Sequence, residues 1–306
     1  MHNQALACPV DCEKKYLFLQ YMPKFRKPLP AALPEPETID IAALAEDLRQ
    51  DRLDLVCVLG PTASGKTKYA VALARNLSGR GLPAEIISAD SRQVYRGMDI
   101  GTGKDLADYG EIPYHLIDIR DAGEQYNAFD FAQDFASVYA DIRSRGSVPV
   151  LCGGTGLYIN AVTAGYDFRS HKPLSMPSAC SGSHPATAGI PSAAGNVLPN
   201  TPRTFFIGTL VDRETRNARI DARLHARLKD GMVDEIRGLL ERGVPAETLI
   251  GYGLEYKFVT LYIQGALSEA ELFEKLSVAI HQFAKRQMTW FRGMERSGTI
   301  IHWVEV

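Results

Sequence analysis

Short apolar runs alternate with helical periodicities over most of the chain, and this alternation is the main structural signal. Strands are expected at 53–59, 84–89, 114–119, 148–151, 204–211 and 300–304. Helical patterns are expected at 68–77, 129–143, 213–229, 233–242 and 269–292. Strands that alternate with helices favour a parallel sheet with right-handed crossovers. We therefore predict an α/β fold, a parallel sheet flanked by helices, with a C-terminal helical part.

Two segments depart from this pattern and divide the chain. Residues 1–50 form a proline-containing N-terminal extension, in which Thr38 is expected to cap a helix over 39–50. Residues 166–203 read as a flexible insertion, because 170–200 is rich in Ser, Ala, Pro and Gly and has little apolar periodicity. The predicted core is therefore split between 51–165 and 204–306.

Composition excludes several classes of protein. Of the 306 residues, 45% are hydrophobic and 23% are charged, as in ordinary globular proteins. No apolar run is long enough to cross a bilayer, and the first ten residues do not resemble a secretory signal, so we expect a cytoplasmic protein. Five cysteines, an odd number, fit a reduced compartment, and no obligate protein partner is evident. A net charge of −2 gives no global attraction to nucleic acid, so any RNA contact must come from a local basic surface.

A phosphate-binding loop follows the first strand of the core. Its residues are Gly60, Pro61, Thr62, Ala63, Ser64, Gly65, Lys66 and Thr67. Strand, glycine-bounded loop and helix is the context that a P-loop requires. The backbone amides and the helix N-terminus attract anionic oxygens, Lys66 adds a positive charge, and the Thr67 hydroxyl can hold Mg²⁺. The sequence thus predicts a site for a diphosphate or a triphosphate.

Polar residues at other strand ends extend this site, because parallel strands place their carboxyl ends at one edge of a sheet. Asp90 could bind magnesium, act as a general base, or only cap the next turn. The residues after it, Ser91, Arg92 and Gln93, could hydrogen-bond a polar substrate. Asp118 and Thr155 lie in two further loops of this kind, Asp118 as a supporting group and Thr155 with an accessible hydroxyl.

Basic residues recur at three places. Lys104 ends a glycine-rich loop and either reaches a phosphate or lies in solvent. Within 213–229, four arginines at spacings of three, four and four form one stripe: Arg216, Arg219, Arg223 and Arg227. Two of these, Arg219 and Arg223, are one turn apart and suited to grip a pyrophosphate. The last helix carries Lys285, Arg286 and Arg292.

Several of these stretches resemble the signatures of tRNA dimethylallyltransferases. They are the P-loop 60–67, the run 88–104 (SADSRQVYRGMDIGTGK), His115–Asp118, Gly153–Tyr158, Arg219–Arg223, Ile250–Tyr252 and Ala284–Arg292. The resemblance covers 53–165 and 204–303 in the family's order. It implies a P-loop NTPase-like fold and transfer of a dimethylallyl group from dimethylallyl diphosphate to the exocyclic amine of the adenosine beside the tRNA anticodon.

The resemblance also assigns roles to residues. Lys66, Mg²⁺ on Thr67, Lys104, Arg219 and Arg223 would neutralise the departing pyrophosphate. Asp90 would take the proton of the amine, so Asp90, Thr67 and Lys66 form the expected catalytic set. For tRNA, the expected residues are Asp90, Ser91, Arg92, Gln93, Thr155, Lys285, Arg286 and Arg292.

One departure leaves other functions open. Family members carry, after the position of Gly165, a helical segment that grips the anticodon stem-loop, whereas 166–203 is short and low in complexity. A reduced grip is compatible with prenylation of a free adenine nucleotide, or with a degenerate P-loop protein that binds RNA without catalysis. A P-loop kinase of small metabolites is a further alternative, which would need ATP and an arginine lid.

Overall fold

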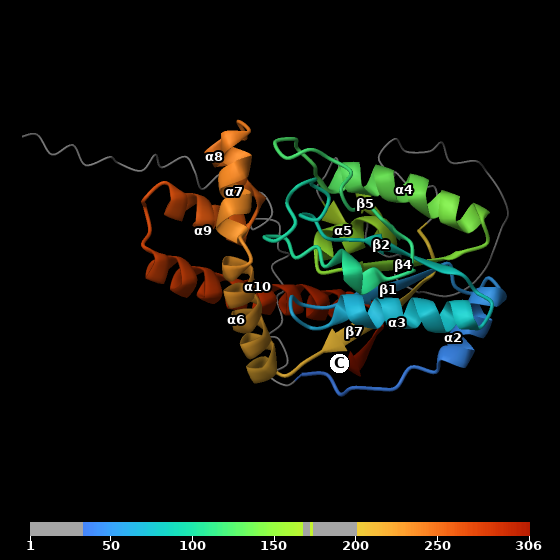
Figure 1. Cartoon of the computed structure of the whole chain (residues 1–306). Coiled ribbons are helices and arrows are strands. Elements are labelled where there is room, and N and C mark those ends of the chain that lie inside the picture. The colour runs from blue at the N-terminus through green and yellow to red at the C-terminus, as the bar shows by residue number, and fades with distance from the viewer. Residues whose placement is uncertain (1–32, 168–171, 174–200) are drawn as a thin grey trace, which may run out of the picture.

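Six parallel strands form the centre of the protein, in a computed structural model that describes residues 33–167, 172–173 and 201–306 (Figure 1). The strands are β1 (Leu55–Leu59), β2 (Ala84–Ser88), β3 (Tyr114–His115), β4 (Val148–Gly153), β7 (Thr204–Leu210) and β8 (Ile301–Glu305). Their order is β3-β2-β4-β1-β7-β8, and every neighbouring pair is parallel. The predicted parallel sheet is confirmed.

Both faces of the sheet are buried, which explains why its strands are apolar runs and not alternating ones. Along β1, Leu55, Cys57 and Leu59 pack into one core, and the intervening valines pack into the other. The second core lies under α2 (Ile41–Arg49) and α3 (Lys66–Gly79). The first lies under α4 (Ala128–Ser144), α5 (Gly156–Asn160) and part of α10 (Glu269–Arg296), on the opposite side of the sheet (Figure 1).

The C-terminal third of the chain adds a helical lobe beside the sheet (Figure 1). It consists of α6 (Arg213–Lys229), α7 (Met232–Glu241), α8 (Ala246–Tyr252), α9 (Leu254–Ile263) and the first half of α10. This confirms the predicted helical part, although α8 and α9 were not expected. The two helices are short, with 7 and 10 residues, and Gly253, at φ 155°, separates them. Neither is long enough to show a clear helical repeat of apolar residues in the sequence.

Two local expectations were wrong. The third strand ends at His115 and not at Ile119, because Leu116 and Asp118 take positive φ angles of 61° and 55° that turn the chain out of the sheet. The cap of α2 is Asp40 and not Thr38. Its Oδ1 accepts hydrogen bonds from the backbone N–H groups of Ala42 and Ala43, which a helix start requires.

Little of the two unusual segments falls within the described residues. In the predicted insertion, β5 (Tyr166–Asp167) pairs with β6 (Lys172–Pro173) in an antiparallel ladder. The rest of the insertion up to residue 200, and most of the proline-containing extension, lie outside the described residues. Among the helices of the described part, none is long and apolar enough to span a membrane.

Candidate active site

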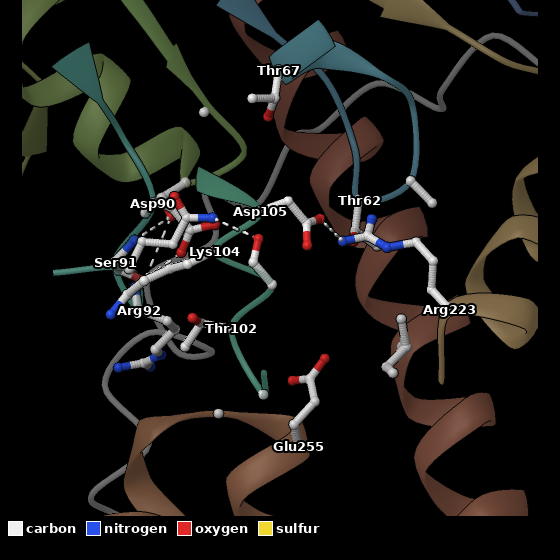
Figure 2. A pocket seen from close by; sticks show the side chains of 18 of the residues that line it. Thr62, Thr67, Asp90, Ser91, Arg92, Thr102, Lys104, Asp105, Arg223 and Glu255 are labelled. Carbon is white, nitrogen blue, oxygen red and sulfur yellow. Dashed lines mark hydrogen bonds and ion pairs between the residues drawn. The ribbon is translucent and has the colours of Figure 1, made fainter. Parts of the chain in front are cut away.

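One cavity of about 1410 Å³ opens at the carboxyl ends of β1, β2 and β4 (Figure 2). Residues of the helices α6, α8, α9 and α10 line its other side. Most of the site residues expected from sequence line it: Thr62, Ala63, Gly65, Lys66, Thr67, Asp90, Ser91, Arg92, Gln93, Lys104, Thr155, Arg219, Arg223 and Arg286. The remaining five, Gly60, Pro61, Ser64, Lys285 and Arg292, do not line it.

The P-loop takes the shape that its sequence predicts. Gly65, at φ 80°, is the residue before α3, and the helix begins at Lys66. This left-handed angle suits glycine and lets the chain turn from the loop into the helix. Two side chains from distant segments support the loop: Thr209 through a hydroxyl contact of 2.6 Å with Ser64, and Gln287 by accepting from the Thr62 N–H at 2.8 Å.

Lys66 lies where a phosphate would bind, in a site that is costly for a charge. Burial lowers the pKa of its ammonium, with Arg223 acting in the same direction and Asp90 and Cys152 opposing it. The Cys152 thiol lies beside the Thr67 hydroxyl, and burial raises its pKa to about 11. An anionic ligand would therefore stabilise the charged form of Lys66.

Asp90 and its neighbours form the part of the cavity wall that follows β2, with β4 between them and the P-loop strand (Figure 2). The Oδ1 of Asp90 accepts from the Arg92 N–H at 2.9 Å, so the carboxylate does cap its turn, yet it also lines the cavity. Thr155 was expected to offer a free hydroxyl. Its Oγ1 accepts from the Ser91 N–H at 3.2 Å, and the side chain is buried. This hydroxyl therefore fixes the Asp90 loop.

Lys104 is neither in solvent nor free to bind phosphate. Its side chain is fully buried, and its ammonium donates to Asp99 at 2.9 Å, to Asp118 and to the carbonyl of Tyr95. Two carboxylates already neutralise the charge, so a phosphate would have to compete with them. The ion pair between Lys104 and Asp118 holds the 97–104 loop in place. Asp118 is thus a supporting residue, as the sequence predicts.

Three of the five arginines of α6 line the cavity, and the first two, Arg213 and Arg216, do not. Arg219, Arg223 and Arg227 line it, whereas Arg216 is buried at the start of the helix and does not. Arg223 lies 3.9 Å from Asp105, and Arg227 lies 3.8 Å from Glu255. Burial lowers the pKa of Arg223, with Arg227 adding to the effect. An anion is the ligand that would relieve this crowding of positive charge.

Two acidic residues of the lobe had no assigned role. Glu255, at the start of α9, faces Arg227 inside the cavity, and burial raises the pKa of its carboxyl. Glu235 of α7 accepts from the N–H groups of Asp99, Ile100 and Gly101, and from the Tyr256 hydroxyl at 2.7 Å. The sequence did not predict a role for either residue, because their partners, such as Arg227 and Asp99, are far away in the sequence.

The cavity could hold Mg²⁺ only if a bound phosphate supplied some of the ligands of the ion. No group of three His, Cys, Asp or Glu side chains that could hold a metal occurs in the part of the chain that the structure describes. Mg²⁺ commonly binds one or two protein oxygens and completes its shell with phosphate oxygens and water. Thr67 and Asp90, which both line the cavity, supply oxygens of the right kind.

Comparisons with known proteins identify the family of this chain. The model of the family described as IPP transferase matches residues 93–185 and 184–294. A protein of Porphyromonas gingivalis named tRNA dimethylallyltransferase 2 is 48% identical, over 82% of this chain and 93% of its own length. A relative from Parabacteroides distasonis, named tRNA dimethylallyltransferase 1, is also 48% identical, over 82% and 92%. Among solved structures, a tRNA isopentenylpyrophosphate transferase of Bacillus halodurans is 30% identical with a TM-score of 0.66, over 82% of this chain and 89% of that one.

The alignments also locate a difference in length. The one with the Porphyromonas protein runs over 287 positions but occupies only 82% of the 306 residues, so that relative has residues within the alignment with no counterpart here. The two segments of the family match meet at 184–185, inside the predicted insertion. With a family match over residues 93–294 and relatives that are 48% identical over 82% of its length, the chain belongs to the IPP transferase family.

Proposed function

We propose that this protein transfers a dimethylallyl group from dimethylallyl diphosphate to the exocyclic amine of an adenosine in tRNA, beside the anticodon. The observation that carries the proposal is that the P-loop and Asp90 line one cavity, at the carboxyl ends of strands of the same sheet. Relatives at 48% identity bear the name of this activity. The proposal therefore rests on both the family and the arrangement of the site.

The P-loop wall suits a diphosphate that becomes a leaving group. As the bond between the dimethylallyl carbon and the diphosphate oxygen breaks, its electron pair leaves with pyrophosphate, and negative charge grows on those oxygens. Lys66, Arg219 and Arg223 supply positive charge there, and they are already in place before the reaction. Mg²⁺, held by Thr67 and phosphate oxygens, would add further charge neutralisation when bound.

The Asp90 wall suits the nucleophile. The new bond forms between the adenine amine nitrogen and the dimethylallyl carbon, and the amine must lose one proton. Asp90 is the carboxylate that lines the cavity next to the P-loop, so we assign that proton to it. The adenine has to leave its stack to reach this wall, where Ser91, Arg92 and Gln93 offer hydrogen-bonding groups.

A second acceptor is favoured by the length difference. If the residues missing relative to the Porphyromonas protein belong to an RNA grip, a free adenine nucleotide could serve as acceptor in the same cavity. Purified protein with labelled dimethylallyl diphosphate, offered unmodified tRNA or AMP, separates the two acceptors. We expect label in tRNA and little in AMP. Label in AMP alone would overturn the tRNA assignment, and label in neither would overturn the transfer reaction.

A further inference from the structure

Gln287 of α10 connects two loops of the cavity that belong to different strands. Its Oε1 accepts from the Thr62 N–H of the P-loop at 2.8 Å, and its Nε2 donates to the Gly154 carbonyl, after β4, at 2.9 Å. The side chain is buried, with 8% of its surface exposed. Both ends of the amide are therefore used, and little water is available to replace either hydrogen bond.

The connection continues to the wall that carries Asp90. Thr155 follows Gly154 directly and accepts from the Ser91 N–H, and Ser91 follows Asp90. A single series of hydrogen bonds thus runs from the P-loop through Gln287 and the 154–155 loop to the residue after the general base. Its ends are the two walls on which the proposed donor and acceptor would bind.

Packing holds Gln287 in this position. A Cβ on Gly154 would lie 2.5 Å from the Gln287 Nε2, and one on Gly156 would lie 2.2 Å from the Trp290 ring. Helix α10 therefore packs closely against the 153–156 loop through Gln287 and Trp290, one helical turn apart. Ala284 and Phe291, on the same helix, are fully buried. Two hydrogen bonds and close packing thus hold the Gln287 amide between the loop and the helix.

We propose that Gln287 is a positioning residue that fixes the P-loop relative to the Asp90 wall, so that a bound diphosphate and the general base keep one separation. Gln287 lines the cavity, and it acts on the two loops through Thr62 and Gly154. The effect on transfer rate rests on the proposed function. The effect on the P-loop does not, because pyrophosphate binding requires no transfer.

The test measures both effects. Gln287→Met keeps the volume of the side chain and removes both hydrogen bonds, leaving the Thr62 N–H and the Gly154 carbonyl unpaired. We expect the Kd for inorganic pyrophosphate, measured by calorimetry, to rise about tenfold. With tRNA and a saturating donor, kcat should fall about tenfold while KM for tRNA stays within about twofold. Gln282→Ala, at an exposed glutamine on the same helix, should change none of these values.

Gln287→Glu covers the case in which Gln287→Met does not fold. It is isosteric and can still accept from Thr62, but it loses the donation to Gly154 and brings negative charge toward the phosphate site. Its Kd for pyrophosphate should rise by more than that of Gln287→Met. A folded variant with unchanged pyrophosphate affinity and unchanged kcat would overturn the proposal. If both variants lose only melting temperature while Kd and kcat per folded molecule are unchanged, Gln287 is structural and the proposal is also wrong.

Discussion

Two basic helices border the cavity, and their charged residues lie in different environments. Three arginines of α6, Arg219, Arg223 and Arg227, line the cavity, and two of them are near carboxylates. On α10, Arg286 lines the cavity, Arg292 pairs with Glu295 at 2.7 Å, and Lys285 is exposed and outside it. In sequence both sets are simply clusters of Lys and Arg.

The difference shows that the same spacing of basic residues can belong to a binding site or to an ordinary surface. A row of arginines at helical spacing usually marks a solvated face. On α6 the row faces a cavity, where burial lowers the pKa of Arg223 and an anion would compensate the charge. On α10 the basic residues point in separate directions, so they do not form one site. We expect the α6 set to bind phosphate and Lys285 to contribute little to it.

The largest expected effect comes from removing the phosphate-facing pair of α6. The double variant Arg219→Gln, Arg223→Gln loses two positive charges that the departing pyrophosphate needs, so kcat/KM for dimethylallyl diphosphate should fall by about 10³. Steady-state kinetics with the donor varied measures it. Arg213→Gln, at an exposed arginine of the same helix, is the matched control and should stay within about twofold. A fall of similar size in the control would contradict the division of roles.

The next effect, about a hundredfold, concerns Lys66 and depends on pH. Burial lowers the pKa of Lys66, so the ammonium loses its proton at a lower pH than an ordinary lysine, and pyrophosphate affinity should fall as pH rises through that lowered pKa. Calorimetric titrations between about pH 7 and 10 measure it. Lys66→Met should bind pyrophosphate about a hundredfold more weakly at pH 7 and lose this part of the pH dependence. A wild-type pH profile that matches the variant's would contradict the role of Lys66.

Lys66 should also affect stability, with the opposite sign. Because the pKa is lower in the folded state than in the unfolded chain, the unfolded chain binds more protons between the two values. The stability of the unliganded protein therefore rises with pH across that window, which ends near the usual lysine value of about 10.4. Unliganded Lys66→Met should melt a few degrees above the wild type at pH 7. A lower melting temperature would show that the charge is well compensated before any ligand binds.

A smaller effect distinguishes Arg227 from its neighbours. Its partner Glu255 is partly buried, and removing that charge frees Arg227 for an anion. Glu255→Gln should therefore strengthen pyrophosphate binding about threefold to tenfold. Glu247→Gln, on α8 and outside the cavity lining, is the control. Weaker binding in Glu255→Gln would mean that Glu255 supports the site instead of competing for Arg227.

The smallest effect should come from Lys285. Since its side chain is exposed and outside the cavity, Lys285→Gln should leave pyrophosphate affinity within about twofold. If it contacts a tRNA phosphate, KM for tRNA should rise a few-fold and the slope of log affinity against log salt should decrease by about one. Filter binding of tRNA at several salt concentrations measures this. A pyrophosphate defect would contradict the contrast between the two helices.

Features formed by residues close together in the sequence were predictable from it. The P-loop combines strand, loop and helix within a few residues, and the strand ends that carry Asp90 and Thr155 follow from apolar runs. Contacts between segments that are far apart in the sequence were not predictable. The Thr62 to Gln287 hydrogen bond spans 225 residues, and Lys104 is neutralised by carboxylates whose positions depend on positive-φ turns. No pattern in the sequence predicts that these residues come into contact.

The central claim is that this cavity prenylates tRNA in the cell. The most direct measurement is mass spectrometry of modified adenosines in tRNA from cells that lack the protein, complemented with the wild type or with Asp90→Ala. We expect prenylated adenosine to disappear on deletion, to return with the wild type, and to stay absent with Asp90→Ala. Prenylated adenosine that persists after deletion, or that Asp90→Ala restores in full, would contradict the claim.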